Sequence, residues 1–413
     1  MSRRNGPPGE GAWRWAHGHL RDRNRLIYVA LLVGVVLFPP VMGLATGVES
    51  ATWVGTAADA GVFVLLAIGL NVVVGFAGLL DLGYAAFFAI GAYTYGMLAS
   101  GLLSASPLHH EIHLPFWLLI FVGMFMAACF GILLGAPTLR LRGDYLAIVT
   151  LGFGEIVPTV FRNLGPGSPI GNWTGGINGI SAIDPPHLPA LLTGPFGFAK
   201  GLDFTDPSIY PIDYYVLMVV IVVGCVILVS NLYSSRLGRA WMAVREDEVA
   251  AAANGVNTVA IKLLAFAIGA SFSGFAGAFY GAKLSLVSSE NFSFVISVTV
   301  LLMVVLGGMG NIPGVIVGSL TIYSVLYVVL PNLPGYAQSA ASAVGLGFLN
   351  QPGLSGNWSG LGDEVQRLNF LLYGLILVVV MVLRPQGLIP SRVREQELAK
   401  GTEEEAVFDL RET

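Results

Sequence analysis

Long apolar runs recur along this chain and limit its fold more than any other feature. Two of them, Tyr214–Leu228 and Leu263–Phe279, contain no charged residue. An α-helix needs about 20 predominantly apolar residues to cross a bilayer. Charged residues make up only 11% of the 413 residues, whereas a soluble domain carries roughly 25%, so a soluble globule of this size could not cover its surface. The sequence therefore predicts an all-α, polytopic membrane protein built as a helical bundle.

The apolar runs predict about ten crossings within a membrane domain of residues 26–390. Eight or nine crossings are alternatives, because the turns at Asp81–Gly83 and Asn311–Ile312 are short. Residues 1–25 contain six arginines and lack the pattern of a cleaved signal peptide, so they and residues 391–413 are predicted to be cytoplasmic tails. The approximate crossings are 26–44, 60–80, 84–103, 115–136, 144–161, 212–232, 262–282, 292–309, 313–331 and 368–384.

The distribution of lysine and arginine provides an independent test of this topology. With the N-terminus in the cytoplasm, 17 of the 21 basic residues fall on the cytoplasmic side, as the positive-inside rule requires. The loop 233–262 is then cytoplasmic, and the loops 162–211 and 332–367 lie outside. Each outer loop is either a docking surface or a tolerated insertion, and the sequence does not separate these alternatives.

Small residues indicate how the helices pack. Glycine and serine recur four residues apart in the seventh predicted crossing, which places them on one helical face and lets a neighbouring backbone approach closely. Packing within the bundle and a contact between subunits are both consistent with this spacing. The cysteines Cys129 and Cys225 both lie in apolar runs and are predicted to pack as small hydrophobic residues without forming a disulfide. The small residues of the seventh crossing are Gly269, Ser273, Gly277 and Gly281.

The sequence lacks the common signatures of catalysis. It contains no Gly-x-x-x-x-Gly-Lys-Ser/Thr loop for nucleotide phosphates, no His-Glu-x-x-His helix and no Gly-x-Ser-x-Gly elbow. In the segment "HHEIH", His109 and His113 could share a helical face and bind a metal, but a solvated polar loop is the favoured interpretation. No metal site and no enzymatic activity are predicted.

Few polar residues lie within the predicted crossings. Asn71 and Glu155 are two of them, and Asp81 lies in a short turn. A carboxylate costs about 2.5–3.5 kcal/mol at the centre of a bilayer, so it usually faces a bundle interior or a wet cavity. Glu155 is therefore a candidate for a transport pathway. The alternatives are a structural partner for a residue such as Arg162, or a position just outside the hydrocarbon.

The cytoplasmic loop 233–262 has a distinctive pattern. Four charged residues, Arg245 to Glu248, precede Val249 and the alanines Ala250–Ala253, which favour a helix, and Gly255 ends it. A short amphipathic helix of this kind suits docking into a groove on a partner protein. A solvated connector is the alternative, and composition does not decide between the two.

Several motifs resemble a known family. "EVAAAANG" at Glu248–Gly255 resembles the Glu-Ala-Ala…Gly loop of ABC importer permeases, with Val249 displacing the first alanine by one place. Between residues 60 and 390 the chain is similar, in matching order, to the M-type permeases of branched-chain amino-acid ABC importers. It departs from them in the N-terminal tail, in loop 162–211 and around 337–366. The further motifs are Gly69–Tyr93, Leu139–Val157, Thr174–Ile180, Ser235–Asn257, Val305–Gly318 and Arg384–Pro390.

This resemblance implies a specific assembly in the bacterial inner membrane. The chain would pair with an H-type permease, two cytoplasmic ATPase subunits and an extracytoplasmic binding protein. It would bind no cofactor, since ATP and Mg²⁺ would be used by the ATPases. The residues implied in ATPase coupling are Arg245, Glu246, Asp247, Glu248, Ala250, Ala251 and Gly255. The candidates for the translocation pathway are Asn71, Asp81, Tyr84, Glu155 and Asn178.

Three rival functions remain at this stage. The same permease type also serves urea and short-chain amide importers. A proton-coupled secondary transporter could use Glu155 as a relay and would need no ATPase. A membrane enzyme is the least supported, because no nucleophile–base arrangement is recognisable.

Overall fold

The computed structural model describes residues 27–44, 50–107, 109, 112–138, 144–169, 171–186, 204, 211–351, 359–383 and 387–389. Several features discussed above lie outside these residues. They are the tails 1–25 and 391–413, most of the second half of loop 162–211, Arg140, Arg142 and His110.

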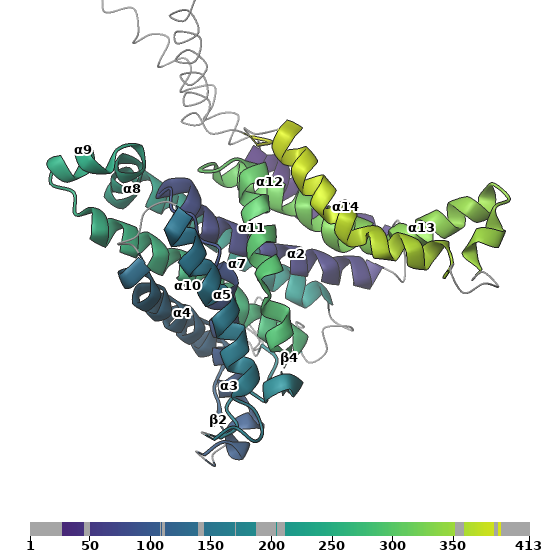
Figure 1. Cartoon of the computed structure of the whole chain (residues 1–413), viewed down its shortest axis with the longest axis horizontal. Helices are drawn as coiled ribbons and strands as arrows, with labels where there is room; N and C mark the ends of the chain where they lie inside the picture. Colours follow the sequence, from purple (N-terminus) through teal and green to yellow (C-terminus); the bar gives the residue numbers. More distant parts are fainter. Residues whose placement is uncertain are drawn as a thin grey trace, which may run out of the picture.

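The described chain is built almost entirely from helices (Figure 1). The first is Ile27–Leu44. The others of ten or more residues are α2 Ser50–Asn71, α3 Tyr84–Leu98, α4 Phe116–Thr138, α5 Asp144–Asn163, α7 Pro211–Ser234, α8 Arg236–Glu246, α10 Thr258–Leu284, α11 Phe294–Gly307, α12 Ile312–Tyr323, α13 Leu330–Ala343 and α14 Leu361–Leu383. Shorter helices are α9 Glu248–Ala253, η3 Gly101–Ala105, η4 Gly176–Asn178, η5 Ser289–Phe292 and η7 Gly347–Asn350, and two π-helical segments are η2 Val72–Phe76 and η6 Ser324–Val329.

Two short antiparallel strand pairs join outer loops. Strand β1, Ala99–Ser100, pairs with β2, Ile112–His113. Strand β3, Ile180–Ser181, pairs with β4, Leu286–Val287. These pairs tie neighbouring loops at the same end of the bundle.

Eight helices in the described residues are long and apolar enough to cross a membrane. This number lies within the predicted range of eight to ten. Helix α3 covers the third predicted crossing with only 15 residues, and α14 covers the tenth. The chain is therefore a multi-pass membrane protein, as the apolar runs predicted.

Two predicted boundaries differ from the structure. Helix α2 begins at Ser50, ten residues before the predicted crossing, and so includes Asp59. Helices α12, η6 and α13 form one continuous helical segment to Ala343, past the predicted loop start at 332. The helix passes Pro331, Pro334 and Gly335 and continues through alanine and serine, which favour a helical backbone more than proline or glycine does.

The connections gather at two ends of the bundle. At one end, Gly310 N donates to Asn71 Oδ1 at 2.8 Å and Leu388 N donates to Leu306 O at 2.6 Å. At the other, the β1–β2 and β3–β4 pairs lie together, and Asp184 N donates to Ala99 O at 2.7 Å. We call the first the inner end, because it holds the segments predicted to be cytoplasmic. Its counterpart is the outer end.

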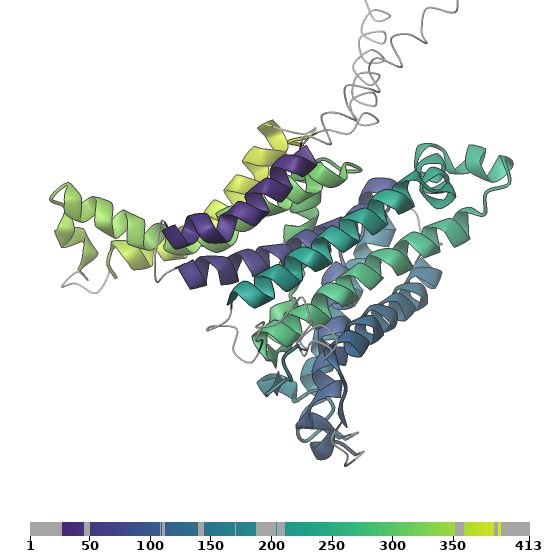
Figure 2. The same cartoon turned by 180° about the vertical axis from the view of Figure 1, so that it is seen from behind.

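Helix α10 forms the centre of the bundle. It packs against α2, α3 and α4, and Figure 2 shows α2, α7 and α10 running side by side. Glycines permit this contact: a Cβ at Gly277 would lie 2.2 Å from the carbonyl oxygen of Phe88, and one at Gly91 would lie 2.1 Å from that of Gly274. The four small residues singled out in the sequence, Gly269, Ser273, Gly277 and Gly281, are all buried within this chain. The two cysteines are free.

Candidate coupling surface and translocation pathway

Helices α8 and α9 form an elbow at the inner end of the molecule (Figure 1). They meet at Asp247, whose backbone is extended, with φ −154° and ψ 108°. Its carboxylate accepts hydrogen bonds from Val249 N at 2.8 Å and Ala250 N at 3.0 Å. The sequence predicted one helix over Arg245–Gly255, but this N-cap divides it, because the aspartate side chain replaces the helical partner of those amides.

The elbow ends at Gly255. Its φ is +83°, a left-handed conformation that side chains disfavour. Gly255 N donates to Ala252 O at 3.0 Å, and Val256 N donates to Ala251 O at 3.1 Å. The glycine therefore turns the chain sharply into α10.

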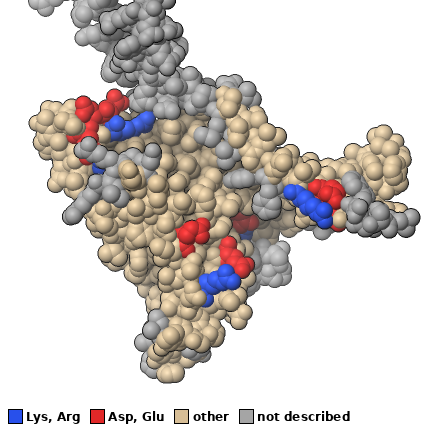
Figure 3. Space-filling model, viewed as in Figure 1, with Lys and Arg blue, Asp and Glu red and all other residues tan. Residues whose placement is uncertain are grey.

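The outward face of the elbow is exposed. Val249 is 75% exposed, Glu246, Asp247 and Ala250 are also exposed, and only Ala251 of α9 is buried. Glu248 forms an ion pair with Lys262, 2.6 Å between Oε2 and Nζ, and so links α9 to α10. Figure 3 shows acidic and basic side chains gathered over this corner on an otherwise mostly uncharged face. The elbow thus presents an exposed apolar residue, Val249, next to the exposed acidic residues Glu246 and Asp247.

The inward face of the elbow is anchored. Trp241 is fully buried, and its Nε1 donates to Ile261 O at 2.8 Å. Arg245 turns inward as well, and its Nη1 donates to Gly75 O at 2.6 Å. Of the residues implied in coupling, Arg245, Glu248 and Ala251 therefore contact other parts of the chain. The others, Glu246, Asp247, Ala250 and Gly255, are exposed.

Three pathway candidates lie inside the bundle near its inner end. Asn71 and Asp81 are buried, and Tyr84 donates its hydroxyl to Gly269 O at 3.1 Å. Asn71 Oδ1 accepts from Gly310 N, while its amide nitrogen has no hydrogen-bond partner. The Tyr84 bond joins α3 to α10, and the Asn71 bond joins the end of α2 to the turn between α11 and α12.

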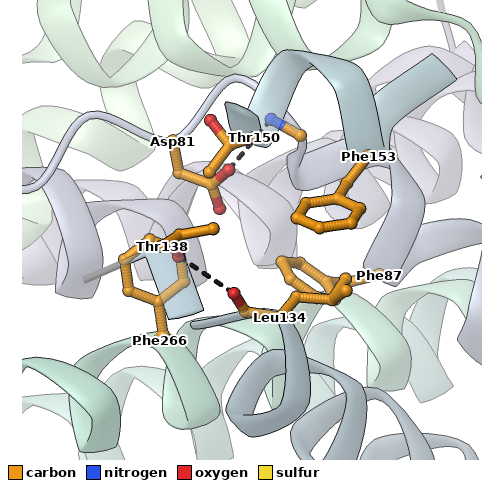
Figure 4. Close-up of a pocket in the computed structure, with 8 residues that line it drawn as sticks. Asp81, Phe87, Leu134, Thr138, Thr150, Phe153 and Phe266 are labelled. Atoms are coloured by element: carbon orange, nitrogen blue, oxygen red, sulfur yellow. Dashed lines mark hydrogen bonds between the residues drawn. The ribbon is translucent and has the colours of Figure 1, made fainter. Parts of the chain in front are cut away.

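Asp81 lies beside a small pocket between α3, α4, α5 and α10 (Figure 4). Its Oδ1 accepts from Gly83 N at 2.9 Å, and its Oδ2 has no hydrogen-bond partner. Burial raises the pKa of the Asp81 carboxyl to about 7, although the Gly83 hydrogen bond lowers it. Besides Asp81 and Gly83, the pocket is lined by Phe87, Leu134, Thr138, Thr150, Phe153 and Phe266.

Glu155 faces out of the bundle. It lies near the middle of α5 on an exposed face that also carries Ile148, Ile156 and Thr159. Within the described chain it forms no ion pair with Arg162, which is also exposed. The carboxyl group of Glu155 therefore lies on the outer face of an apolar helix. No other part of the described chain buries this carboxyl group.

The remaining sequence candidates lie at the outer end. Asn178 is exposed at the end of η4, away from the buried candidates. His113 Nδ1 lies 2.5 Å from Asp184 Oδ2, so this histidine pairs with a carboxylate of a neighbouring loop. The described part of the chain contains no cluster of three or more His, Cys, Asp or Glu side chains that could hold a metal.

The structure contains one buried charged pair that the sequence analysis did not predict. Lys283, buried near the outer end of α10, donates to Asp59 Oδ1 and to Gly55 O, the latter at 2.8 Å. Both charged residues were placed just outside the predicted crossings. The sequence did show an acidic and a basic residue at the outer margins of two predicted crossings. It could not show that they pair, because the pairing depends on how α2 and α10 pack.

Comparisons with known proteins agree with this architecture. Residues 53–381 match the family described as "Branched-chain amino acid transport system / permease component". The chain is 38% identical to the high-affinity branched-chain amino acid transport system permease protein LivM of Escherichia coli K12, over 92% of this chain and 78% of that protein. It is 25% identical to a probable LivM permease of Methanocaldococcus jannaschii, over 80% and 91% of the two chains.

A second type of permease also matches. The LivH permease protein of Escherichia coli K12 is 26% identical over 62% of this chain and 78% of its own length. No solved structure matches the chain significantly. The family match covers most of the helical bundle and the elbow within it, and the chain belongs to the permease components of branched-chain amino acid transport systems.

Proposed function

We propose that this chain is the M-type permease of an ATP-driven importer of branched-chain amino acids. The LivM relatives support the substrate, and the similarity to LivH supports a pair of related permeases. Two cytoplasmic ATPase subunits would hold ATP and Mg²⁺, and a binding protein outside the membrane would deliver the amino acid. The permease itself needs no cofactor in this scheme.

The observation that carries the proposal is the exposed elbow. Force from an ATPase must enter through a surface that is accessible yet firmly attached to the bundle. The elbow has both properties, because Val249 is exposed while Trp241 is buried and bonded to Ile261 O. A short exposed helix fits a groove on a partner. In this orientation the inner end and both termini face the cytoplasm.

The exposed face of α5 supports a pathway between two permeases. An acidic residue within the membrane normally faces protein or a water-filled cavity. Because Glu155 faces away from its own chain, the H-type permease would cover it, and the amino acid would pass between the two subunits. The buried candidates Asn71 and Tyr84 would then stabilise the bundle, since their polar atoms bond Gly310 and Gly269.

Reconstituted transport tests the proposal. The full complex in proteoliposomes should take up leucine when ATP is present, and Glu248→Lys should reduce that uptake by breaking the ion pair with Lys262 and changing the docking face. Glu364→Lys is the matched control, because it reverses an acidic residue of α14 that pairs with Arg367, far along the chain from the elbow. Leucine uptake driven by a proton gradient without ATPases, or uptake of urea in place of leucine, would contradict the proposal.

A further inference from the structure

Arg245 connects the elbow to the inner end of α2, which is buried in the bundle. It lies in the last turn of α8, and its guanidinium donates to Gly75 O at 2.6 Å. Gly75 lies in η2, the π-helical segment with which α2 ends. The contact joins residues 170 positions apart in the sequence, so it links two otherwise separate elements.

The η2 segment differs from the helix before it. Its wider turns are seen in the bond from Ala77 N to Val72 O at 3.2 Å, five residues apart. Single π turns inside α-helices occur often at functional sites, and the last carbonyls of a helix lack partners within it. Arg245 supplies a charged donor to such a carbonyl, which is a stronger bond than one between neutral groups.

The same segment contacts a third element. A Cβ at Gly75 would lie 2.1 Å from Asn71 Oδ1 and 2.6 Å from Gly310 N, and Asn71 Oδ1 itself accepts from Gly310 N. Gly310 belongs to the turn between α11 and α12. The elbow, the end of α2 and this turn therefore meet at one point, which we call the Arg245 junction (Arg245, Gly75, Asn71 and Gly310).

The aliphatic part of the Arg245 side chain packs closely against the backbone of Gly78 at the junction. Gly78 has φ +70°, and a Cβ there would lie 2.8 Å from Arg245 Cγ. A small cavity beside the junction is bounded by Phe76, Tyr233 and Met242. The absence of a side chain at Gly78 makes room for the arginine side chain, which also lines the cavity.

The two hydrogen bonds that anchor α8, from Trp241 and from Arg245, reach helical segments of different regularity. Trp241 bonds to α10, which is packed tightly against three helices. Arg245 bonds to η2, whose hydrogen bonding is already irregular. The two hydrogen bonds therefore attach α8 to one regular and one irregular helical segment.

We propose that Arg245 is a positioning residue that transmits movement of the elbow to η2, so that η2 bends as the hinge of α2 during transport. This inference rests on the proposed function. In this inference Arg245 acts through its hydrogen bond to Gly75 within the permease and not through contact with the ATPase. Asn71 extends the same movement to the α11–α12 turn.

The test measures leucine transported per ATP hydrolysed by the complete complex in proteoliposomes. Arg245→Met should lower this ratio at least about tenfold, because it removes a charge-assisted hydrogen bond from the transmitting contact. Arg245→Lys should recover most of the ratio, because lysine can still donate to Gly75 O. The matched control is Arg239→Met, since Arg239 on the same helix donates to Ser234 O at 3.0 Å and does not reach η2.

The outcomes separate this inference from the proposed function. If the native complex transports leucine but Arg245→Met keeps the native ratio, or Arg239→Met lowers it equally, the transmitting role is overturned. If the native complex moves no leucine with ATP, the proposed function itself fails. Should Arg245→Met not assemble, Asn71→Ala tests the junction from its other side: the same loss is expected, and a native ratio would overturn the inference.

Discussion

Helices α10 and α5 both extend between the two ends of the bundle, but their surroundings are opposite. Helix α10 contacts α2, α3 and α4, and most of its residues are buried. Helix α5 packs on one side only, and Tyr145, Ile148 and Glu155 of its other side are exposed. The first helix carries its small residues inward, and the second carries a carboxyl outward.

This difference follows from the bilayer as a solvent. Lipid is as apolar as leucine, so helices in a membrane gain little by burying hydrophobic surface and instead gain from close contact between small residues. A polar residue is costly unless protein or water meets it. Small residues therefore indicate packing within the chain, whereas the exposed Glu155 is the basis of the proposal that another subunit covers this face.

The strongest test of this comparison places the same substitution on both helices. Gly277→Leu should destabilise the isolated chain by more than about 3 kcal/mol, because its Cβ would meet the backbone oxygen of Phe88, which cannot rotate away. Gly152→Leu on α5 should leave it unchanged, since nothing described lies within 4 Å of a Cβ there. Thermal unfolding in detergent measures both. Equal stability of the two variants would refute the distinction between the helices.

The buried charge pair gives the next largest effect. Lys283→Met should cost about 3 kcal/mol, because it leaves Asp59 without its charged partner beside α10. The double variant Asp59→Asn/Lys283→Met should recover much of that loss, since no unpaired charge remains. The same unfolding measurement applies. A double variant that is less stable than Lys283→Met alone would show that Asp59 has a role beyond the pair.

Glu155 tests the open face directly. Glu155→Gln should reduce leucine uptake by about tenfold through loss of a charged interaction, with no change in the stability of the isolated chain. Glu155→Asp, which keeps the charge, should retain more uptake. Uptake by the reconstituted complex and unfolding of the isolated chain are the two measurements. If Glu155→Gln unfolds the chain and leaves transport per folded molecule intact, Glu155 is structural.

The cap of α9 gives the smallest expected effect. Asp247→Ala should destabilise this short helix by about 1 kcal/mol, because Val249 N and Ala250 N lose their acceptor. Hydrogen exchange at these two amides should then be faster, while Asp247→Asn should keep it slow. Unchanged exchange in Asp247→Ala would mean that the cap does not hold the elbow in shape.

Local patterns in the sequence were sufficient for much of the fold. Apolar length predicted the helical crossings, and four-residue spacing identified a close-packing face of α10, which the structure buries within the bundle. A short helix ending at Gly255 was also expected from the alanines, although the break at Asp247 that makes the elbow was not. Such features depend on residues within a few helical turns of one another, so the sequence displays them directly.

The tertiary structure decided which distant residues meet. It extended α2 outward to Ser50, paired Asp59 with Lys283 across 224 positions, and turned Arg245 inward to Gly75. It also left Glu155 on the outer face of α5. In each case the stabilising contact exists only when separate helices are packed in one orientation, and composition or spacing along a single helix does not contain that orientation.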